Sequence, residues 1–142
     1  MKSFLAYRST GEDPEVIKPL LSSVREVFRN KGIDMYATFF DDKFFLHKDF
    51  SKRQIMDHAL KTIEHSDFLF VLVTSDKKSE GMLMEIGFCL AKSIPIVVAI
   101  KDDVKDTYIP EIAQTYIRWS DTENLIETIK NYNFNQIEAR SS

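Results

Sequence analysis

Residues 68–100, FLFVLVTSDKKSEGMLMEIGFCLAKSIPIVVAI, determine the fold class of this 142-residue chain. Two of its segments, 68–73 and 94–100, are apolar at every position, as are parallel strands that are buried on both faces. Between them, a polar loop over 74–80 leads into a mostly apolar helix over 81–92. A strand, a helix and a second strand in this order predict a right-handed crossover between parallel strands.

The alternation of strands and helices continues outward from this unit. Residues 4–7, 33–38 and 115–119 are predicted as further strands, and apolar positions at helical spacing predict helices between them. We therefore expect an α/β fold with three layers, in which helices cover both faces of a flavodoxin-like (Rossmann-like) parallel sheet of five strands in the order 2-1-3-4-5. One domain is expected over 1–132, followed by a polar tail over 133–142 that frays.

Helix boundaries carry local signals. Gly32 is expected in the left-handed conformation that ends a first helix, and the clash between Pro19 and the carbonyl of Glu15 suggests that this helix becomes regular only near Pro19. A third helix is expected to begin with a capping box, and the last one to be capped in the same way; the two residue pairs are Ser51 with Gln54 and Ser120 with Glu123.

Composition narrows the classes of function. Nineteen basic residues against 22 acidic ones give a net charge of −3, which is too balanced for a nucleic-acid groove or a surface that binds anionic membranes. One cysteine excludes an internal disulfide, and no apolar run reaches the length of a membrane span. His47 and His58 lack ligand partners at metal-site spacing, so we expect no metal site, and no cofactor is expected. The single cysteine, the short apolar runs and a start too short in apolar residues for a signal peptide lead us to expect a cytoplasmic location.

The topology predicts where a ligand would bind. In such sheets it lies beyond the carboxyl ends of the strands, which selects the loops 7–13, 39–50 and 74–80. Glu85, in the helix that follows the third loop, has only apolar neighbours one turn away, so burying its carboxylate would cost several kcal/mol unless it has a function. Gly81 and Gly87 leave room for a ligand or strand. The alternative is a solvent-facing Glu85 with glycines for packing.

The pattern Gly81-x-x-x-Glu85-Ile86-Gly87 resembles the signature of nucleoside 2-deoxyribosyltransferases and nucleoside 5′-monophosphate N-glycosidases. The resemblance extends over about residues 4–102. It implies that Glu85 is a nucleophile that attacks the anomeric carbon of the sugar, expels the base and forms a glycosyl-enzyme ester, which water or a second base then resolves. The implied partner is a small nucleoside or nucleotide, with no nucleic-acid polymer and no membrane.

The resemblance also assigns residues to substrate binding. Ser79 stands where the transferases have an Asp for the 5′-hydroxyl and the monophosphate glycosidases have a phosphate-binding Ser, so it favours a 5′-phosphate; a plain helix cap is the alternative. Arg8 and Ser9 are expected at the phosphate, and Tyr7 is expected to hydrogen-bond Glu85. A surface charge at Arg8 and a packed aromatic ring at Tyr7 are the alternatives.

One position departs from the family pattern. Ala59 occupies the place of the usual acid that handles the leaving base, and Asp57 or His58 could replace that acid after a small shift in register. The loop over 39–50 holds five phenylalanines, which are expected to stack on a base, with Phe40 and Phe45 as the main contacts, or to form the interface of a homodimer or higher homo-oligomer.

Two other functions remain open. Residues 4–9 also resemble the first strand of Toll/interleukin-receptor-type domains, some of which cleave the nicotinamide bond of NAD with a helical Glu. A non-catalytic nucleotide-binding module of the same fold is the third alternative. The favoured expectation is cleavage of the N-glycosidic bond of a (deoxy)nucleoside or its 5′-monophosphate, by hydrolysis or base exchange.

Overall fold

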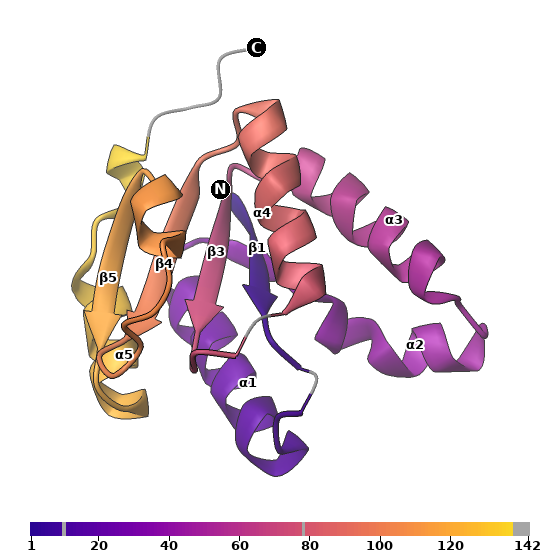
Figure 1. Ribbon diagram of the computed structural model, residues 1–142, viewed down its shortest axis with the longest axis horizontal. Helices are drawn as coiled ribbons and strands as arrows, with labels where there is room; N and C mark the ends of the chain where they lie inside the picture. Colours follow the sequence, from indigo (N-terminus) through magenta and orange to yellow (C-terminus); the bar gives the residue numbers. More distant parts are fainter. Residues whose placement is uncertain (10, 78, 138–142) are drawn as a thin grey trace.

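A computed structural model describes residues 1–9, 11–77 and 79–137 and contains the predicted five-stranded sheet (Figure 1). All neighbouring strands are parallel, in the order β2-β1-β3-β4-β5. The predicted fold class is therefore confirmed. The strands are β1 (Lys2–Tyr7), β2 (Asp34–Tyr36), β3 (Phe68–Val73), β4 (Ile96–Lys101) and β5 (Thr115–Trp119).

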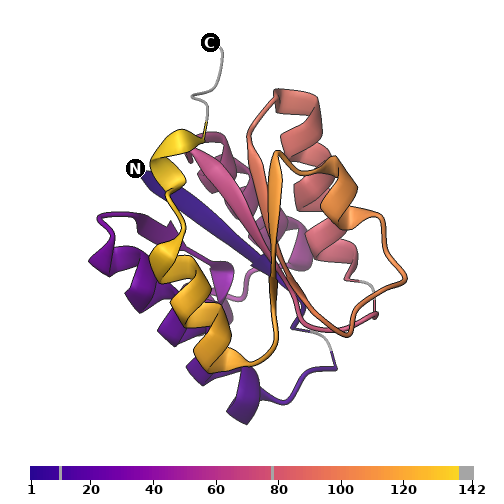
Figure 2. The ribbon, with the colours of Figure 1, turned by 90° about the vertical axis from the view of Figure 1, so that its left-hand side faces the viewer.

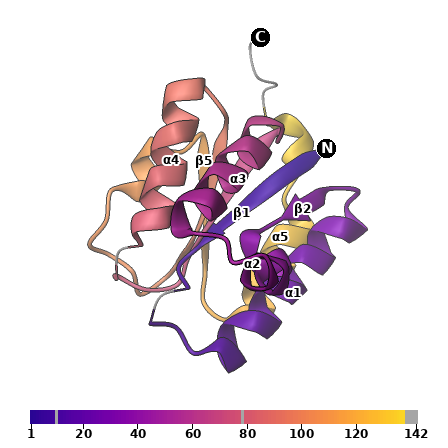
Figure 3. The same cartoon turned by 90° about the vertical axis from the view of Figure 1, so that its right-hand side faces the viewer.

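Helices cover both faces of the sheet, as Figures 2 and 3 show from opposite sides. One layer contains α1 (Pro14–Asn30) and α5 (Thr122–Asn131), and the other contains α3 (Lys52–Glu64) and α4 (Glu80–Lys92). Alternate residues of β3 enter different cores: Phe68 and Phe70 pack in the core of α1 and α5, and Leu69 packs in that of α3 and α4. This two-sided burial explains why β3 is apolar at every position.

The start of α1 corrects one expectation. The helix begins at Pro14 under an Asp13 cap, and Pro19 lies inside it rather than at its start. Pro19 cannot donate to the carbonyl of Glu15, but both residues are on the exposed face, where water can satisfy that carbonyl. At the other end Gly32 has a φ of 77°, so its predicted left-handed conformation is confirmed.

Side-chain caps begin α3 and α5. The predicted capping box of Ser51 and Gln54 is present in α3. The prediction for α5 was wrong by one residue: Asp121 is the cap, and its carboxylate accepts a hydrogen bond of 2.8 Å from the backbone N–H of Asn124. The backbone N–H of Ser120 instead donates to the Asn124 side chain at 2.8 Å. A carboxylate at the cap also favours the helix dipole.

Residues 38–47 fold into the 3-10 helix η1 (Thr38–Asp41) and the short helix α2 (Asp42–His47), so the second strand is shorter than predicted. A further 3-10 helix, η2 (Ile109–Ile112), precedes β5. In the part of the chain that the structure describes, no helix is both long and apolar enough to cross a membrane.

The C-terminal segment also differs from the expectation of a frayed tail. Residues 134–136 form the 3-10 helix η3 (Phe134–Gln136), and Phe134 is only 2% exposed. Its ring stacks on Phe68 with centroids 5.6 Å apart and lies 4.8 Å from the ring of Phe28. The core thus extends beyond the expected boundary at residue 132, while 138–142 lie outside the described residues.

Candidate active site

A cavity of about 160 Å³ lies where the segments after β1, β2 and β3 meet α3 and α4. This is the carboxyl edge of the sheet, at the point where the strand order reverses between β1 and β3. Residues far apart in the sequence therefore meet at the predicted place. The cavity is lined by Leu5, Tyr7, Ser9, Thr38, Ile55, Met56, Ala59, Ser79, Gly81, Met82 and Glu85.

Glu85 is the acidic residue of this cavity. It lies in the second turn of α4 and is 8% exposed, which excludes the alternative of a solvent-facing side chain. Its carboxylate forms no hydrogen bond or ion pair with another described residue. Desolvation by burial raises the pKa of Glu85 to about 8, so the folded protein favours the neutral carboxyl group at pH 7.

The two glycines of the motif lie in different surroundings. Gly81 lines the cavity one turn before Glu85, where an added Cβ would meet only the Met56 methyl carbon, at 3.8 Å. Gly87 is exposed, and an added Cβ would have no described atom within 4 Å. The expected close approach of a strand at Gly87 is therefore not found, because this position faces away from the sheet.

Tyr7 ends β1 and lines the cavity beside Glu85. Desolvation by burial is the main cause that raises the pKa of Tyr7 to about 12; the Thr38 side chain lowers it, and the negative charges of Glu85 and Asp42 raise it. The expected hydrogen bond from Tyr7 to Glu85 is absent between these two described side chains. Tyr7 is thus an electrostatic neighbour of two carboxyl groups.

The two serines are placed as expected at the cavity. Ser79 caps α4, where its Oγ accepts a hydrogen bond of 3.3 Å from the backbone N–H of Met82, and it also lines the cavity. The cap and a ligand-binding role are therefore compatible. Ser9, after the end of β1, lines the same cavity. Both hydroxyls can face a polar ligand near the positive end of the α4 dipole.

Arg8 is not among the residues that line the Glu85 cavity. Its Nη1 forms an ion pair of 2.6 Å with Glu12 Oε1, and its side chain is 13% exposed. It lines a separate cavity of about 20 Å³ on the other side of Ser79, which has room for little more than one water molecule. Arg8, expected at the phosphate, is therefore not brought to the Glu85 cavity, because successive side chains of an extended segment point in opposite directions. Thr10 lies outside the described residues.

The substitutes considered for the missing acid also lie elsewhere. Ala59 does line the Glu85 cavity and is 1% exposed. Asp57 is exposed on α3, where it forms an ion pair of 3.2 Å with Arg53. Asp57 is therefore not brought to the Glu85 cavity, since two residues along a helix turn a side chain by about 200°. His58 Nε2 lies 3.0 Å from the Tyr36 hydroxyl, outside the cavity lining.

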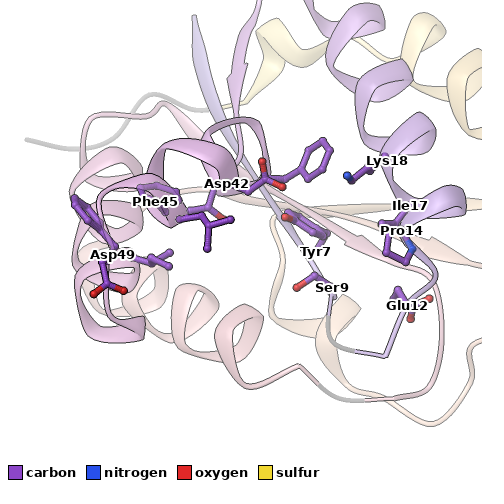
Figure 4. Close-up of a pocket in the computed structure, with 14 residues that line it drawn as sticks. Tyr7, Ser9, Glu12, Pro14, Ile17, Lys18, Asp42, Phe45 and Asp49 are labelled. Atoms are coloured by element: carbon purple, nitrogen blue, oxygen red, sulfur yellow. The ribbon is translucent and has the colours of Figure 1, made fainter.

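A larger cavity of about 460 Å³ adjoins the first (Figure 4). Tyr7, Ser9, Thr38 and Ile55 line both, so a ligand can extend from one to the other. The two together fall within the roughly 300–1,000 Å³ range of small-molecule sites. The other lining residues come from α1, η1 and α2 and their loops: Glu12, Pro14, Ile17, Lys18, Phe39, Asp42, Phe45, Leu46, Asp49 and Phe50.

The phenylalanines of 39–50 divide between this cavity and other contacts. Phe45 lines it as expected, whereas Phe40 is absent from its lining and packs against the Arg25 guanidinium, 4.2 Å from the ring centroid. Phe40 is therefore not brought to the site, because η1 turns it toward α1. On α2, Phe44 and Leu46 are 50% and 84% exposed. The homo-oligomeric interface stays a prediction.

Sequence reasoning missed Asp42 and Lys18 in this cavity. The helical spacing of Pro14, Ile17 and Lys18 could have placed Lys18 near the first loop, but η1 and α2 have no clear period that would orient Asp42. No group of three or more potential metal-ligating side chains occurs among residues 1–9, 11–77 and 79–137.

Comparisons with known proteins show the family and support the fold. A family model of nucleoside 2-deoxyribosyltransferase matches residues 15–134. A 2-deoxyribosyltransferase from the psychrotolerant bacterium Bacillus psychrosaccharolyticus has 18% identity and a TM-score of 0.71, with 100% of this chain and 99% of that one covered. The CMP N-glycosidase BcmB of Clostridium botulinum has 17% identity and a TM-score of 0.72, with 94% and 100% covered.

A conserved protein from Enterococcus faecalis V583 has 18% identity and a TM-score of 0.54, with 92% of this chain and 98% of that one covered. At these identities the three likenesses establish the fold. A search of curated protein sequences finds no match.

Proposed function

The chain belongs to the nucleoside 2-deoxyribosyltransferase family, and from this premise we propose that it cleaves the N-glycosidic bond of a (deoxy)nucleoside 5′-monophosphate with Glu85 as nucleophile. Hydrolysis is the favoured outcome and base exchange the alternative. The family is enzymatic, and its members act on small nucleoside substrates.

The observation that carries the proposal is the buried Glu85 carboxyl group at a cavity, without a hydrogen-bond or ion-pair partner among the described residues. Burying a carboxyl group without a partner is costly, and groups with strongly perturbed pKa values concentrate at functional sites. Glu85 also faces a space large enough for a ligand together with the adjoining cavity. A purely structural role would leave this carboxyl group without a reason to be there.

The proposed reaction has two steps. The ionised Glu85 carboxylate attacks the anomeric carbon as the bond from that carbon to the base nitrogen breaks, and the electron pair leaves with the base. The resulting ester is attacked by water, which returns the carboxylate and releases the sugar, or by the nitrogen of a second base, which forms a new glycosidic bond. The proton that the attacking group loses neutralises the anion of the departed base. The apolar residues Leu5, Ile55 and Met82 around Glu85 limit bulk water near the charge that develops in the transition state.

We place the sugar and its phosphate in the Glu85 cavity and the base in the larger one. Ser9 and Ser79 supply hydroxyl groups for the phosphate, and the backbone N–H groups at the start of α4 add to them. Phe39, Phe45 and Phe50 supply apolar and aromatic surface for the base. Tyr7, which lines both cavities, then lies beside the glycosidic bond that breaks.

The test incubates the protein with a panel of nucleosides, their 5′-monophosphates and NAD, and measures the release of free base by chromatography. We expect release from at least one monophosphate and loss of at least 1,000-fold in rate for Glu85→Gln, since the amide cannot act as nucleophile. Asp57→Asn is the matched control, because its exposed carboxylate lies outside both cavities. Retained activity in Glu85→Gln would overturn the mechanism.

A second candidate is favoured by one observation. Ala59 lines the cavity where an acid would handle the leaving base, and Asp57 does not replace it. A nucleotide-binding module without turnover is consistent with that loss. Binding of a monophosphate with no release of base from any member of the panel would favour this module, and release from NAD alone would favour an NAD-cleaving domain.

A further inference from the structure

Asp42 is the acidic residue of the larger cavity that lies next to Tyr7. It is the first residue of α2 and lines the cavity together with Phe45 of the same helix. Figure 4 shows its side chain between Phe45 and Tyr7, on the cavity side of α2. The negative charge of Asp42 contributes to the raised pKa of Tyr7, as does that of Glu85. Tyr7 therefore lies within electrostatic reach of both carboxyl groups.

The Asp42 carboxylate is available to a ligand. It forms no hydrogen bond or ion pair with any other described residue, whereas neighbouring Asp41 accepts a hydrogen bond of 2.7 Å from the Tyr36 hydroxyl. In the same cavity, Glu12 is already paired with Arg8. The ammonium group of Lys18 lies 5.9 Å from the centroid of the Phe39 ring, on the α1 side of the cavity. The side near Tyr7 thus presents an acceptor.

From this arrangement we propose that Asp42 selects nucleotides whose base bears an exocyclic amino group, as in cytosine and adenine, by accepting a hydrogen bond from that group. The inference rests on the proposed function, since it places the base beyond Tyr7 and the sugar at Glu85. An ionised carboxylate can only accept hydrogen bonds. A base with a carbonyl group at the same position, as in uracil or hypoxanthine, places two acceptors against each other, which the site rejects.

Ala59 offers the base no polar contact, which leaves this role to Asp42. Its methyl group gives the α3 side of the Glu85 cavity no hydrogen-bonding atom for the base. Near α2, Phe45, Leu46 and Phe50 make the rest of the larger cavity's lining apolar, except for Asp49. Asp49 follows the C-terminal end of α2, whereas Asp42 begins the helix and is the one of the two whose charge acts on Tyr7. Asp42 therefore supplies the polar contact that distinguishes one base from another, while the aromatic rings hold any base without discrimination.

The test compares kcat/KM for two pairs of substrates that differ at one group, CMP with UMP and AMP with IMP. We expect at least tenfold preference for the amino-bearing member of a pair that is cleaved. In Asp42→Asn the amide can donate to a carbonyl oxygen, so the preference should fall at least tenfold or reverse. Asp57→Asn is the control, because its carboxylate lies outside both cavities.

The outcomes separate the two proposals. No release of base from any of the four nucleotides or from their 2′-deoxy counterparts would count against the proposed function. Release from UMP and IMP at rates equal to those for CMP and AMP would overturn the role of Asp42 and leave the proposed function intact. Unchanged preference in a folded Asp42→Asn variant, verified by circular dichroism, would overturn it as well.

Discussion

Replacement of Glu85 by Gln should make the stability of the protein less dependent on pH. The folded state raises the pKa of Glu85 from the ordinary value of 4.5 to about 8 through desolvation. Between these values the unfolded chain releases the Glu85 proton and the folded protein retains it. The unfolded state therefore binds fewer protons, and the stability of the wild type falls as the pH rises.

The magnitude follows from the width of this interval. Each pH unit within it corresponds to about 1.4 kcal/mol, so between pH 5 and pH 7 the wild type should lose about 3 kcal/mol relative to Glu85→Gln. The buried amide has its own cost, but that cost does not vary with pH. The difference between the two proteins as a function of pH therefore isolates the titration of Glu85.

Urea unfolding at pH 5, 6, 7 and 8 measures this difference. Trp119, the single tryptophan, is 4% exposed and gives a fluorescence signal for the transition. Glu80→Gln, an exposed position on the same helix, is the matched control and should unfold in parallel with the wild type. If the stability of Glu85→Gln also varies with pH in parallel with that of the wild type from pH 5 to 8, the Glu85 carboxyl group is hydrated in the folded protein and its desolvation is refuted.

Three further predictions concern the pH dependence of the reaction, the phosphate site and the C-terminal segment. The kcat/KM for base release should rise about tenfold per pH unit up to about pH 8 and then level off, because the free enzyme must ionise Glu85; a flat profile from pH 6 to 9 would contradict this. Ser79→Asp should weaken cleavage of monophosphates at least tenfold more than that of nucleosides, through repulsion of the phosphate; equal losses would argue against a phosphate at Ser79. Phe134→Ala should lower the free energy of unfolding by about 3–5 kcal/mol in urea titrations, since it empties a core position; a loss below about 1 kcal/mol would mean that the segment frays.

The sheet could be predicted because its signal repeats along the chain. In β3 every residue is buried, so six consecutive apolar residues allow one interpretation. Phe134 carries no such signal, since a single aromatic residue among asparagines and a glutamine resembles a solvated tail. Its burial depends on the gap beside Phe28 and Phe68, which exists only after α1 has packed on the sheet.

The site could be predicted in part for a related reason. Glu85 was recognisable because it interrupts an apolar helix at a known edge of the fold. Asp42 and Arg8 could not be oriented, because short helices and loops have no period that assigns a side chain to one face. Arg8 turns to Glu12 four residues later, a local ion pair that competes with any ligand for its guanidinium.

The stability of the protein bears on whether the site is catalytic. Desolvation of Glu85 costs the folded state several kcal/mol at neutral pH. This cost is large compared with the 5–15 kcal/mol by which a typical domain is stable. A module that only bound nucleotides would gain stability from an amide or an apolar residue at this position, and cavities can bind sugars through uncharged groups. A reaction that needs the carboxylate as a nucleophile explains why a carboxyl group stands at position 85 although it lowers the stability of the folded protein. If Glu85→Gln is more stable than the wild type, binds monophosphates as tightly and releases no base, then Glu85 lowers the stability of the fold and is needed for turnover. If the wild type binds monophosphates but also releases no base, that explanation fails.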